Sequence, residues 1–227
     1  MSALALGTIA ADSLPESIFS TPCQYFTQGA TWSNRIAITV DDGWFPEKVE
    51  KMCKMASECD VPISAFPVGK VVQNSPDLWL RMVKDGVELF NHTMDHRNLG
   101  DEEVDAKRQI LDWERTYQGL GVGEYKNKII RLPRNNGVDT RLFKIVTALG
   151  YVGIAGWTMG SKGYMQSYTV EKVMEDLLPN LRGGSIILLH FVDTDIAALP
   201  YIAKILHERK LRPVKLSELP GTPVYQQ

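Results

Sequence analysis

Short strand-like segments alternate along the chain with segments in which hydrophobic residues have the period of a helix. Short β-branched runs, such as RIAITV at 35–40, are typical of buried strands. Between these runs, apolar residues recur three and four positions apart, as they do after Pro46, and this is the period of a helix. The predicted strands span 35–40, 61–68, 87–90, 128–131, 151–155, 185–189 and 212–216. The predicted helices span 46–56, 76–85, 101–118, 139–149, 170–178 and 196–209.

Strands that alternate with helices are typical of parallel βα units, arranged as an open sheet or as a closed barrel. The 227 residues contain no internal repeat and no clear linker, which favours a single domain. We therefore expect residues 35–227 to form that domain. Residues 1–34 show few periodic signals, and we expect them to be an irregular N-terminal extension.

Composition adds exclusions rather than a function. Hydrophobic residues make up 44% of the chain and charged residues 23%, as in an ordinary globular protein and unlike a disordered one. A net charge of −2 and a pI near 6.1 argue against nucleic acid as a partner. No apolar run approaches the roughly 18 residues of a membrane span, so we expect no integral membrane segment. Nothing in these features sets an oligomeric state.

Three cysteines, Cys23, Cys53 and Cys59, are an odd number at wide spacing, which does not make a disulfide framework. Cys53 falls in the apolar stripe of a predicted helix, where a buried small hydrophobic residue is expected. A bridge between Cys23 and Cys59 that ties down the N-terminal arm stays open at this point.

Histidine is scarce, with four in the chain, and three of the four follow predicted strands. In parallel βα folds the strand ends meet at one edge, where active sites lie. His92 and His96 have a spacing that would place two imidazoles on one helical face, which suits a metal ion. His190 ends another strand. His207 lies in a charged segment, and we expect it to be solvated helix surface.

Asp41, Asp42 and Arg131 also follow predicted strands. Each has an ordinary explanation when taken alone, because Asp-Gly is a common turn pair and an arginine after a strand can form a surface ion pair. Together with the histidines they are more specific. One carboxylate and two histidines make an open zinc set that leaves a position for water. The spare carboxylate can then act as a base and the spare histidine as an acid.

These residues fall in ordered motifs that resemble those of the polysaccharide deacetylase family (carbohydrate esterase family four). The family's TFDDG, H[ST]xxH, RxPxG and LxLH read here as TVDDG at 39–43, HTMDH at 92–96, RLPRNNG at 131–137 and ILLH at 187–190. The segment 214–219 is similar to the family's last strand, so the resemblance covers about residues 35–219. It implies an α/β fold, a distorted (β/α) barrel of seven or eight strands.

The resemblance also implies a divalent metal, zinc first, with cobalt or nickel as alternatives. Carried over by position, Asp42, His92 and His96 are the expected ligands. Asp41 is the expected general base, and Arg131 is expected to pair with Asp41 and keep it ionised.

The remaining expected roles concern the leaving group and the substrate. The resemblance implies that His190 protonates the leaving amine, and that a backbone N–H around Arg134 helps to stabilise the oxyanion. Leu188 is expected to line a pocket for the acetyl methyl group. Four aromatic residues near the motifs could stack on sugar rings, although ordinary packing explains each of them equally well: Trp44, Phe45, Trp157 and Tyr164. Trp44 and Phe45 are the better candidates, because they directly follow Gly43 in a predicted loop.

Two motifs depart from the family pattern. In the third, Gly137 lies four residues after Pro133 instead of two, and Arg134 stands where the family has an aromatic residue. This puts the identity of the oxyanion donor in doubt. The fourth motif, WDVDxxDW-like in the family, reads WTMGSKGY at 157–164 and has lost every aspartate, including the one that orients the acid histidine in the family.

Two explanations for the missing aspartate are open. Either Asp193 or Asp195, just beyond His190, supplies a substitute carboxylate. Or His190 works unassisted, in which case activity would be lower or shifted to acid pH.

The leading functional prediction is a metal-dependent N-deacetylase that removes acetyl groups from GlcNAc-containing glycans, of the peptidoglycan or chitin type. One alternative keeps the metal and takes small amides as substrates. A second is a catalytically weak or inactive metal-bearing protein that binds glycans. Through the family alone, a glycan substrate implies a periplasmic, cell-surface or secreted protein.

Overall fold

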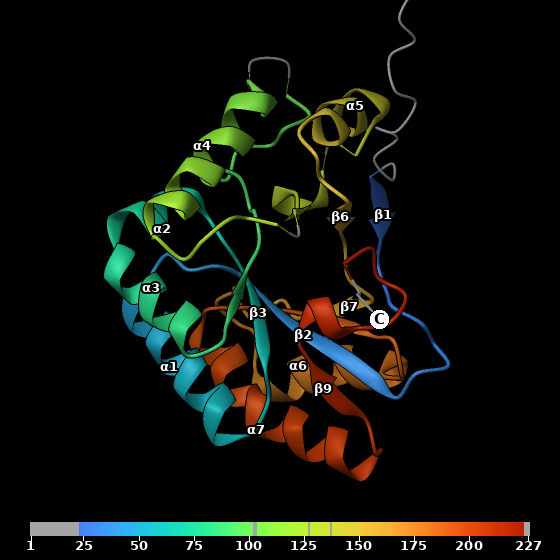
Figure 1. Ribbon diagram of the computed structural model, residues 1–227. Helices are drawn as coiled ribbons and strands as arrows, with labels where there is room; N and C mark the ends of the chain where they lie inside the picture. Colours follow the sequence, from blue (N-terminus) through green and yellow to red (C-terminus); the bar gives the residue numbers. More distant parts are fainter. Residues whose placement is uncertain (1–22, 102–103, 127, 137, 225–227) are drawn as a thin grey trace, which may run out of the picture.

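The computed structural model describes residues 23–101, 104–126, 128–136 and 138–224 (Figure 1). Its strands are β1 (Gln24–Phe26), β2 (Arg35–Asp42), β3 (Ile63–Pro67), β4 (Glu88–Leu89), β5 (Ile129–Ile130), β6 (Gly153–Ala155), β7 (Met159–Gly160), β8 (Ile186–His190) and β9 (Arg212–Val214). Its helices are α1 (Pro46–Glu58), α2 (Gly69–Asn74), α3 (Pro76–Lys84), α4 (Ala106–Gly119), α5 (Thr140–Ala148), α6 (Val170–Leu177) and α7 (Asp193–Glu208).

The strands form two parallel sheets. One has the order β4-β3-β2-β8-β7, with β9 beside the beginning of β2, and the other has the order β1-β6-β5. Single bridges join the sheets on both sides, between Asn91 and Ile130 and between Gln28 and Ser185. The predicted α/β class with parallel βα units is confirmed, and the arrangement is an open, distorted form of the expected barrel.

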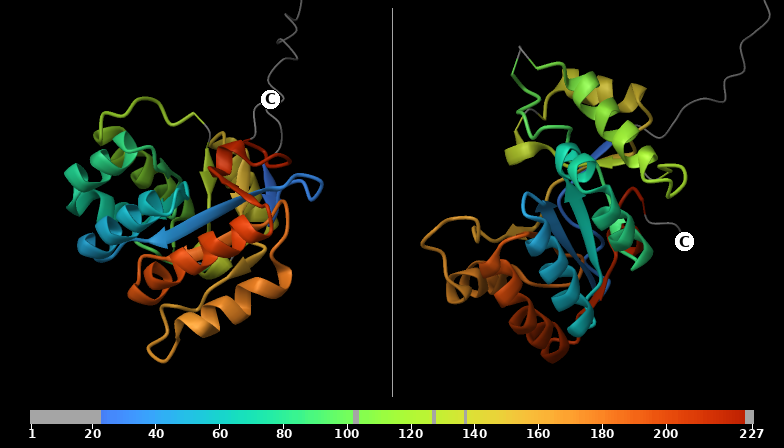
Figure 2. Two further views of the ribbon diagram at one scale, coloured as in Figure 1. Left: turned by 90° about the horizontal axis from the view of Figure 1, so that it is seen from below. Right: turned by 90° about the vertical axis from the view of Figure 1, so that its left-hand side faces the viewer.

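Strand β2 runs through the middle of the molecule, as Figure 1 shows. It pairs with β3 on one side and β8 on the other, and its residues 36–40 are completely buried. A strand covered on both faces needs a continuous apolar run, which is why RIAITV is not alternating. Helix α1 packs beside α7, which packs beside α6, while α4 packs against α2 and α5, and α3 contacts both α1 and α2 (Figure 2).

Some elements differ from the sequence predictions. Part of the segment expected to be irregular, Gln24–Phe26, is strand β1, which pairs with β6 in parallel. Three residues are too few to show a period of two, so the pattern of the sequence did not reveal this strand. Strand β7 and helix α2 were not predicted either, because they are also too short to show a period. Helix α7 begins at Asp193, three residues before the predicted start.

The cysteine question is settled by the structure, because Cys23, Cys53 and Cys59 are all free. The bridge considered between Cys23 and Cys59 is therefore not formed. Burial raises the pKa of Cys23 to about 11, and burial together with Asp85 raises that of Cys53 to about 12. Within the described residues, no helix combines the length and the apolar character needed to cross a bilayer.

Candidate active site

The predicted chemical residues come together at the carboxyl ends of the strands. Asp41 and Asp42 end β2, and Asp41 is the register partner of His190 at the end of β8. His92 follows β4, and Arg131 directly follows β5. Parallel strands bring their carboxyl ends to one edge, and this is why Asp41 and His190, 149 positions apart in the sequence, meet here.

Asp42, His92 and His96 form a compact set of possible metal ligands. One ligand atom from each lies within 4.8 Å of the others. Asp42 Oδ1 is 3.5 Å from His92 Nε2 and 3.3 Å from His96 Nε2. Ligand atoms around a tetrahedral zinc ion would be about 3.4 Å apart, given the usual bond lengths. Asp42 Oδ1 is also buried without a hydrogen-bond partner among the described residues, so the donor set fits a divalent ion.

The two histidines reach this position through a turn, not a helix. The segment after β4 is irregular, and Thr93 and His96 have φ angles of +64° and +62°. The His96 N–H donates to Thr93 Oγ1 at 3.2 Å. The prediction that both imidazoles lie on one helical face is therefore wrong, because left-handed turns inside the segment bring the rings together. The His92 ring is oriented by its Nδ1, which lies 2.9 Å from the carbonyl oxygen of Arg131 and leaves Nε2 facing the site.

The charges of this cluster shift its pKa values in opposite directions. Burial alone would raise the pKa of Asp42, but the nearby His92 imidazole, with smaller contributions from His190 and His96, outweighs it and lowers the pKa to about 2. Burial alone would lower the pKa of His92, but Asp41 and Asp42 outweigh it and raise the pKa. The pKa of His96 is lowered by burial and by the neighbouring charge of His92.

Asp41 and Arg131 form a buried ion pair next to this set. Arg131 is 0% exposed, and its Nη1 donates to Asp41 Oδ1 at 2.8 Å and to Thr39 Oγ1 at 2.8 Å. Its other nitrogens donate to the carbonyl oxygens of Ala155 and Gly156. Asp41 Oδ2 lies 3.8 Å from His92 Nε2, so this oxygen faces the candidate metal position. The sequence reasoning missed Thr39, although it opens the first motif.

His190 lies across the cluster, beside residues from two other elements. Tyr164, from the loop after β7, places its ring edge-on with the centroids 5.0 Å apart. Asp195, from the first turn of α7, is fully buried, and its Oδ2 lies 3.9 Å from His190 Nδ1. Burial raises the pKa of Asp195, although Ser161 and the N–H of His190 oppose the shift. Asp193, the other candidate carboxylate, is exposed and pairs with Lys48.

The expected substrate residues have different surroundings. Trp44 is 47% exposed, with its ring edge-on to His96 at a centroid distance of 6.0 Å. Leu188 is buried on β8, two residues before His190. Trp157 is half-buried, 5.8 Å from the Arg131 guanidinium, so it supports that side chain more than it offers an open surface.

The third-motif loop contains one tight turn. Residues 133–135 form a 3₁₀ turn in which Arg134 is exposed and has a φ angle of +58°. Tyr25 of β1 hydrogen-bonds with the neighbouring Asn135. Gly137 lies outside the described residues. The backbone N–H of Arg134 as oxyanion donor stays a prediction.

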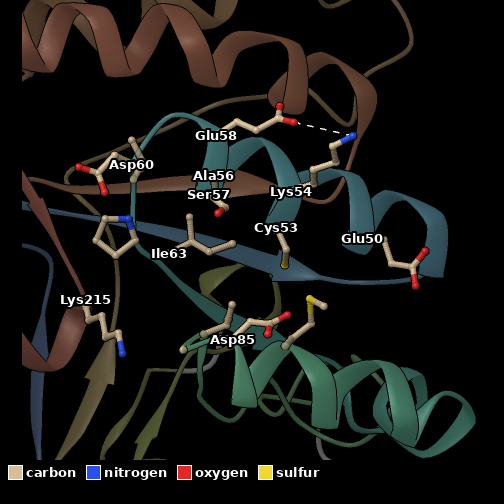
Figure 3. Close-up of a pocket in the computed structure, with 15 residues that line it drawn as sticks. Glu50, Cys53, Lys54, Ala56, Ser57, Glu58, Asp60, Ile63, Asp85 and Lys215 are labelled. Carbon is tan, nitrogen blue, oxygen red and sulfur yellow. Dashed lines mark ion pairs between the residues drawn. The ribbon is translucent and has the colours of Figure 1, made fainter.

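A separate groove lies at the opposite end of the strands. Its volume is about 790 Å³, and its lining includes Cys53 and Glu58 of α1, Ile63 at the start of β3, Met82 of α3 and Lys215 (Figure 3). None of the residues of the polar cluster lines it. In parallel βα folds this end serves stability, so we place the active site at the other end.

Solved structures with similar folds include two instructive proteins. The Bc1960 peptidoglycan N-acetylglucosamine deacetylase is 25% identical and superposes with a TM-score of 0.78, covering 87% of this chain and 93% of that one. BA3943 from Bacillus anthracis, described as a CE4 family pseudoenzyme, has a TM-score of 0.79 at 18% identity, covering 87% of this chain and 69% of that one. The second likeness concerns the fold alone, and it shows that the fold does not guarantee activity.

Curated relatives agree in sequence over most of the chain. A chitooligosaccharide deacetylase of Sinorhizobium fredii is 28% identical over 80% of this chain and 90% of its own. A peptidoglycan-N-acetylglucosamine deacetylase of Bacillus cereus is 28% identical over 81% of this chain and 87% of its own. The family model described as polysaccharide deacetylase matches residues 28–154, more than half of the chain. The chain therefore belongs to the polysaccharide deacetylase family.

Proposed function

We propose that the protein is a metal-dependent N-deacetylase that removes acetyl groups from GlcNAc-containing glycans. One observation carries the proposal: the compact set of Asp42, His92 and His96 lies beside the buried Asp41–Arg131 pair. His190 at the end of the neighbouring strand completes the residues that amide hydrolysis needs. Related proteins named as deacetylases of chitooligosaccharides and peptidoglycan support the choice of glycan.

Asp42, His92 and His96 would hold the metal, with zinc as first choice and cobalt or nickel as alternatives. When bound, such an ion supplies Lewis-acid polarisation and lowers the pKa of a water molecule. The Nδ1 contact of His92 fixes its ring so that Nε2 stays directed at the ligand position.

Asp41 is the proposed general base. Its Oδ1 is held by Arg131, which leaves Oδ2 to accept the proton of the attacking water. Arg131 is enclosed by oxygen acceptors, so its guanidinium stays in place and holds Asp41 Oδ1 in a fixed position.

His190 is the proposed general acid. As the C–N bond breaks, the ring gives a proton to the amine nitrogen of the sugar, and acetate leaves with the oxygen from water. The backbone N–H near Arg134 is the proposed donor to the oxyanion. Leu188 is on the same side of β8 as His190, because side chains alternate along a strand, and it is the proposed contact of the acetyl methyl group.

Exposed aromatic side chains at this end of the molecule suit sugar rings. Trp44 and Phe45 follow β2 and are 47% and 57% exposed, and Tyr164 beside His190 is 62% exposed. We propose that Trp44 and Trp157 contact the glycan, Trp44 by stacking and Trp157 from its half-buried position beside Arg131. A glycan substrate also suggests that the protein works in the periplasm, at the cell surface or after secretion.

The test is acetate release from chitooligosaccharides, peptidoglycan fragments and a panel of small acetamides, with zinc or cobalt added, between pH 5 and 9. We expect turnover of at least one GlcNAc-containing substrate and loss of it on chelation, with recovery when metal is restored. Turnover confined to small amides would contradict the glycan assignment. Glycan binding without turnover under every condition would show an inactive glycan-binding protein instead.

A further inference from the structure

We propose that Asp195 is the positioning residue of His190, so that the carboxylate missing from the loop after β7 is supplied from the first turn of α7. The inference rests on the proposed deacetylase function and adds a role to it. Asp195 touches neither the substrate nor the candidate metal position, and it acts through the imidazole.

The carboxylate of Asp195 is hydrogen-bonded to the backbone of His190 and also faces its imidazole ring. Its Oδ2 accepts the backbone N–H of His190 at 2.7 Å and lies 3.9 Å from the ring Nδ1. That nitrogen is buried and has no hydrogen-bond partner among the described residues. At 3.9 Å the contact with Asp195 is an ion-pair distance, longer than a hydrogen bond. Catalytic hydrogen bonds are often long before substrate binds, and we expect this contact to shorten in the complex with substrate.

The loop after β7 makes room for the Asp195 carboxylate and donates a hydrogen bond to it. Ser161 Oγ donates to Asp195 Oδ1 at 2.6 Å and receives the N–H of Gly163 at 3.2 Å. A Cβ atom on Gly163 would lie only 2.1 Å from Asp195 Oδ1. The segment that lost its aspartates therefore supplies a hydroxyl donor and the empty space that Asp195 fills.

Charged and titratable groups face His190 from three elements: Asp41 and Asp42 of β2, Tyr164 of the loop after β7, and Asp195 of α7. Only Asp195 lies within 4 Å of the ring Nδ1 among the described ion pairs. Its place in the first turn of α7 also favours a negative charge, because the helix dipole is positive there. Asp193 lies in the same turn but is exposed and paired with Lys48, so it is not the substitute.

The expected effect is on the tautomer of His190. A carboxylate that accepts from Nδ1–H leaves Nε2 as the nitrogen that meets the substrate, and it stabilises the imidazolium. In Asp195→Ala this acceptor is gone, and a neutral ring without an acceptor at Nδ1 carries its proton mainly on Nε2. A wrong tautomer of this kind is costly even when the geometry is preserved.

The experiment uses the full chain labelled with ¹⁵N at histidine, and the His190 signals are assigned by their loss in His190→Gln. We expect Asp195→Ala to change the ¹⁵N shifts of His190 from the Nδ1–H to the Nε2–H pattern. We also expect kcat to fall roughly tenfold to a hundredfold while KM changes less than about twofold. Asp193→Ala, the same chemical change two residues earlier, should leave the shifts, kcat and melting temperature as they are.

A folded Asp195→Ala protein with unchanged His190 shifts and unchanged kcat would overturn the proposal. If that variant does not fold, Ser161→Ala tests the same carboxylate by removing the donor to its other oxygen. A loss of several-fold in kcat with an altered Nδ1 signal supports the role of Asp195, and the wild-type signal and rate would refute it. Because the shifts are read without substrate, an Nδ1–H pattern in a protein that turns over no substrate would refute the deacetylase function alone.

Discussion

The two oxygens of Asp41 have different surroundings, and this difference defines what the residue can do. Oδ1 is bound to Arg131 at 2.8 Å, while Oδ2 lies 3.8 Å from His92 Nε2 and faces the candidate metal position. A carboxylate with one oxygen anchored and one free is suited to take a proton without losing its position. The adjacent Asp42 has no such anchor, and its unpartnered Oδ1 is the atom expected to bind the ion.

Asp41→Asn should abolish the base and keep the metal. The amide retains the shape of the side chain but cannot accept the proton, so we expect kcat to fall by about 10² to 10⁴. One equivalent of zinc per chain should remain, because Asp42, His92 and His96 are intact. Acetate release and metal analysis of the same preparation check both points. Turnover that survives in Asp41→Ala would show that another group is the base.

Zinc affinity should fall as the pH is lowered, and His92 should set the range. A histidine must lose its proton to bind zinc, and the raised pKa of His92 means that it holds this proton to higher pH than usual. Asp42, with a pKa of about 2, and His96, with a lowered pKa, are already deprotonated there. We expect a loss of about tenfold per pH unit below the pKa of His92, which corresponds to one proton.

Competition with a chromophoric chelator between pH 8 and pH 5.5 measures how steeply the zinc affinity falls with pH. A flat profile would contradict the raised pKa, and a slope of two from the outset would show that His96 competes for protons as well. Asp42→Asn should weaken zinc binding throughout the range, since it removes the only charged ligand of the set.

At the scale of the element, long and regular segments were predictable and short ones were not. Helix α1 was predicted to begin at Pro46 and does so, and α5 begins one residue after its predicted start, with Asp139 as its N-cap. Strand β2 followed from its β-branched run. In contrast, β1 and β7 contain three and two residues and are defined only by the strands that they pair with.

The candidate active site was also predictable in one part and not in another. The residues that follow strands were predicted to meet, because the parallel arrangement alone brings Asp41, His92, Arg131 and His190 to one edge. The choice between Asp193 and Asp195 was not predictable, since the helix was expected to start after both of them. In the structure both lie in the first turn of α7, and their different directions follow from the helical rotation between them.

The cap of α5 gives a test at this scale. The Asp139 side chain accepts the N–H of Leu142 at 2.7 Å. Asp139→Ala should lower the free energy of unfolding by about 1 kcal/mol, because the amide group is left without its partner. Asp139→Asn keeps an acceptor oxygen and should cost only a small fraction of that. Urea unfolding of the three proteins measures the difference, and equal losses in both variants would point to charge rather than capping.

At the scale of the whole molecule, Arg131 connects the two sheets. It follows β5 of one sheet, contacts the carbonyl oxygens of Ala155 and Gly156 at the end of β6, and reaches Thr39 and Asp41 on β2 of the other. The ring of Phe66 on β3 lies 4.1 Å from its guanidinium. The same side chain therefore supports the base and connects the two sheets at the carboxyl ends of their strands.

Arg131→Met should destabilise the fold by roughly 3–5 kcal/mol, because it leaves the Asp41 carboxylate buried without its cation. The matched double variant with Asp41→Asn should recover part of this loss, since the unpaired charge is gone. Chemical denaturation of the wild type, both single variants and the double variant measures the coupling. Additive losses would show that the two side chains stabilise the fold independently.

The position of Asp195 has a consequence for how members of such a family are sorted into working enzymes and silent relatives. A chain that lacks the aspartates of one motif would be discarded by any pattern read along the sequence. Yet the buried carboxylate next to His190 comes from a residue that no motif includes, opposite a glycine that leaves room for it. A carboxylate that is absent from one loop can thus be supplied beside the same histidine by a neighbouring helix. Judging whether such chains are active requires comparing the positions of side chains in the structure, and not the sequence motifs alone.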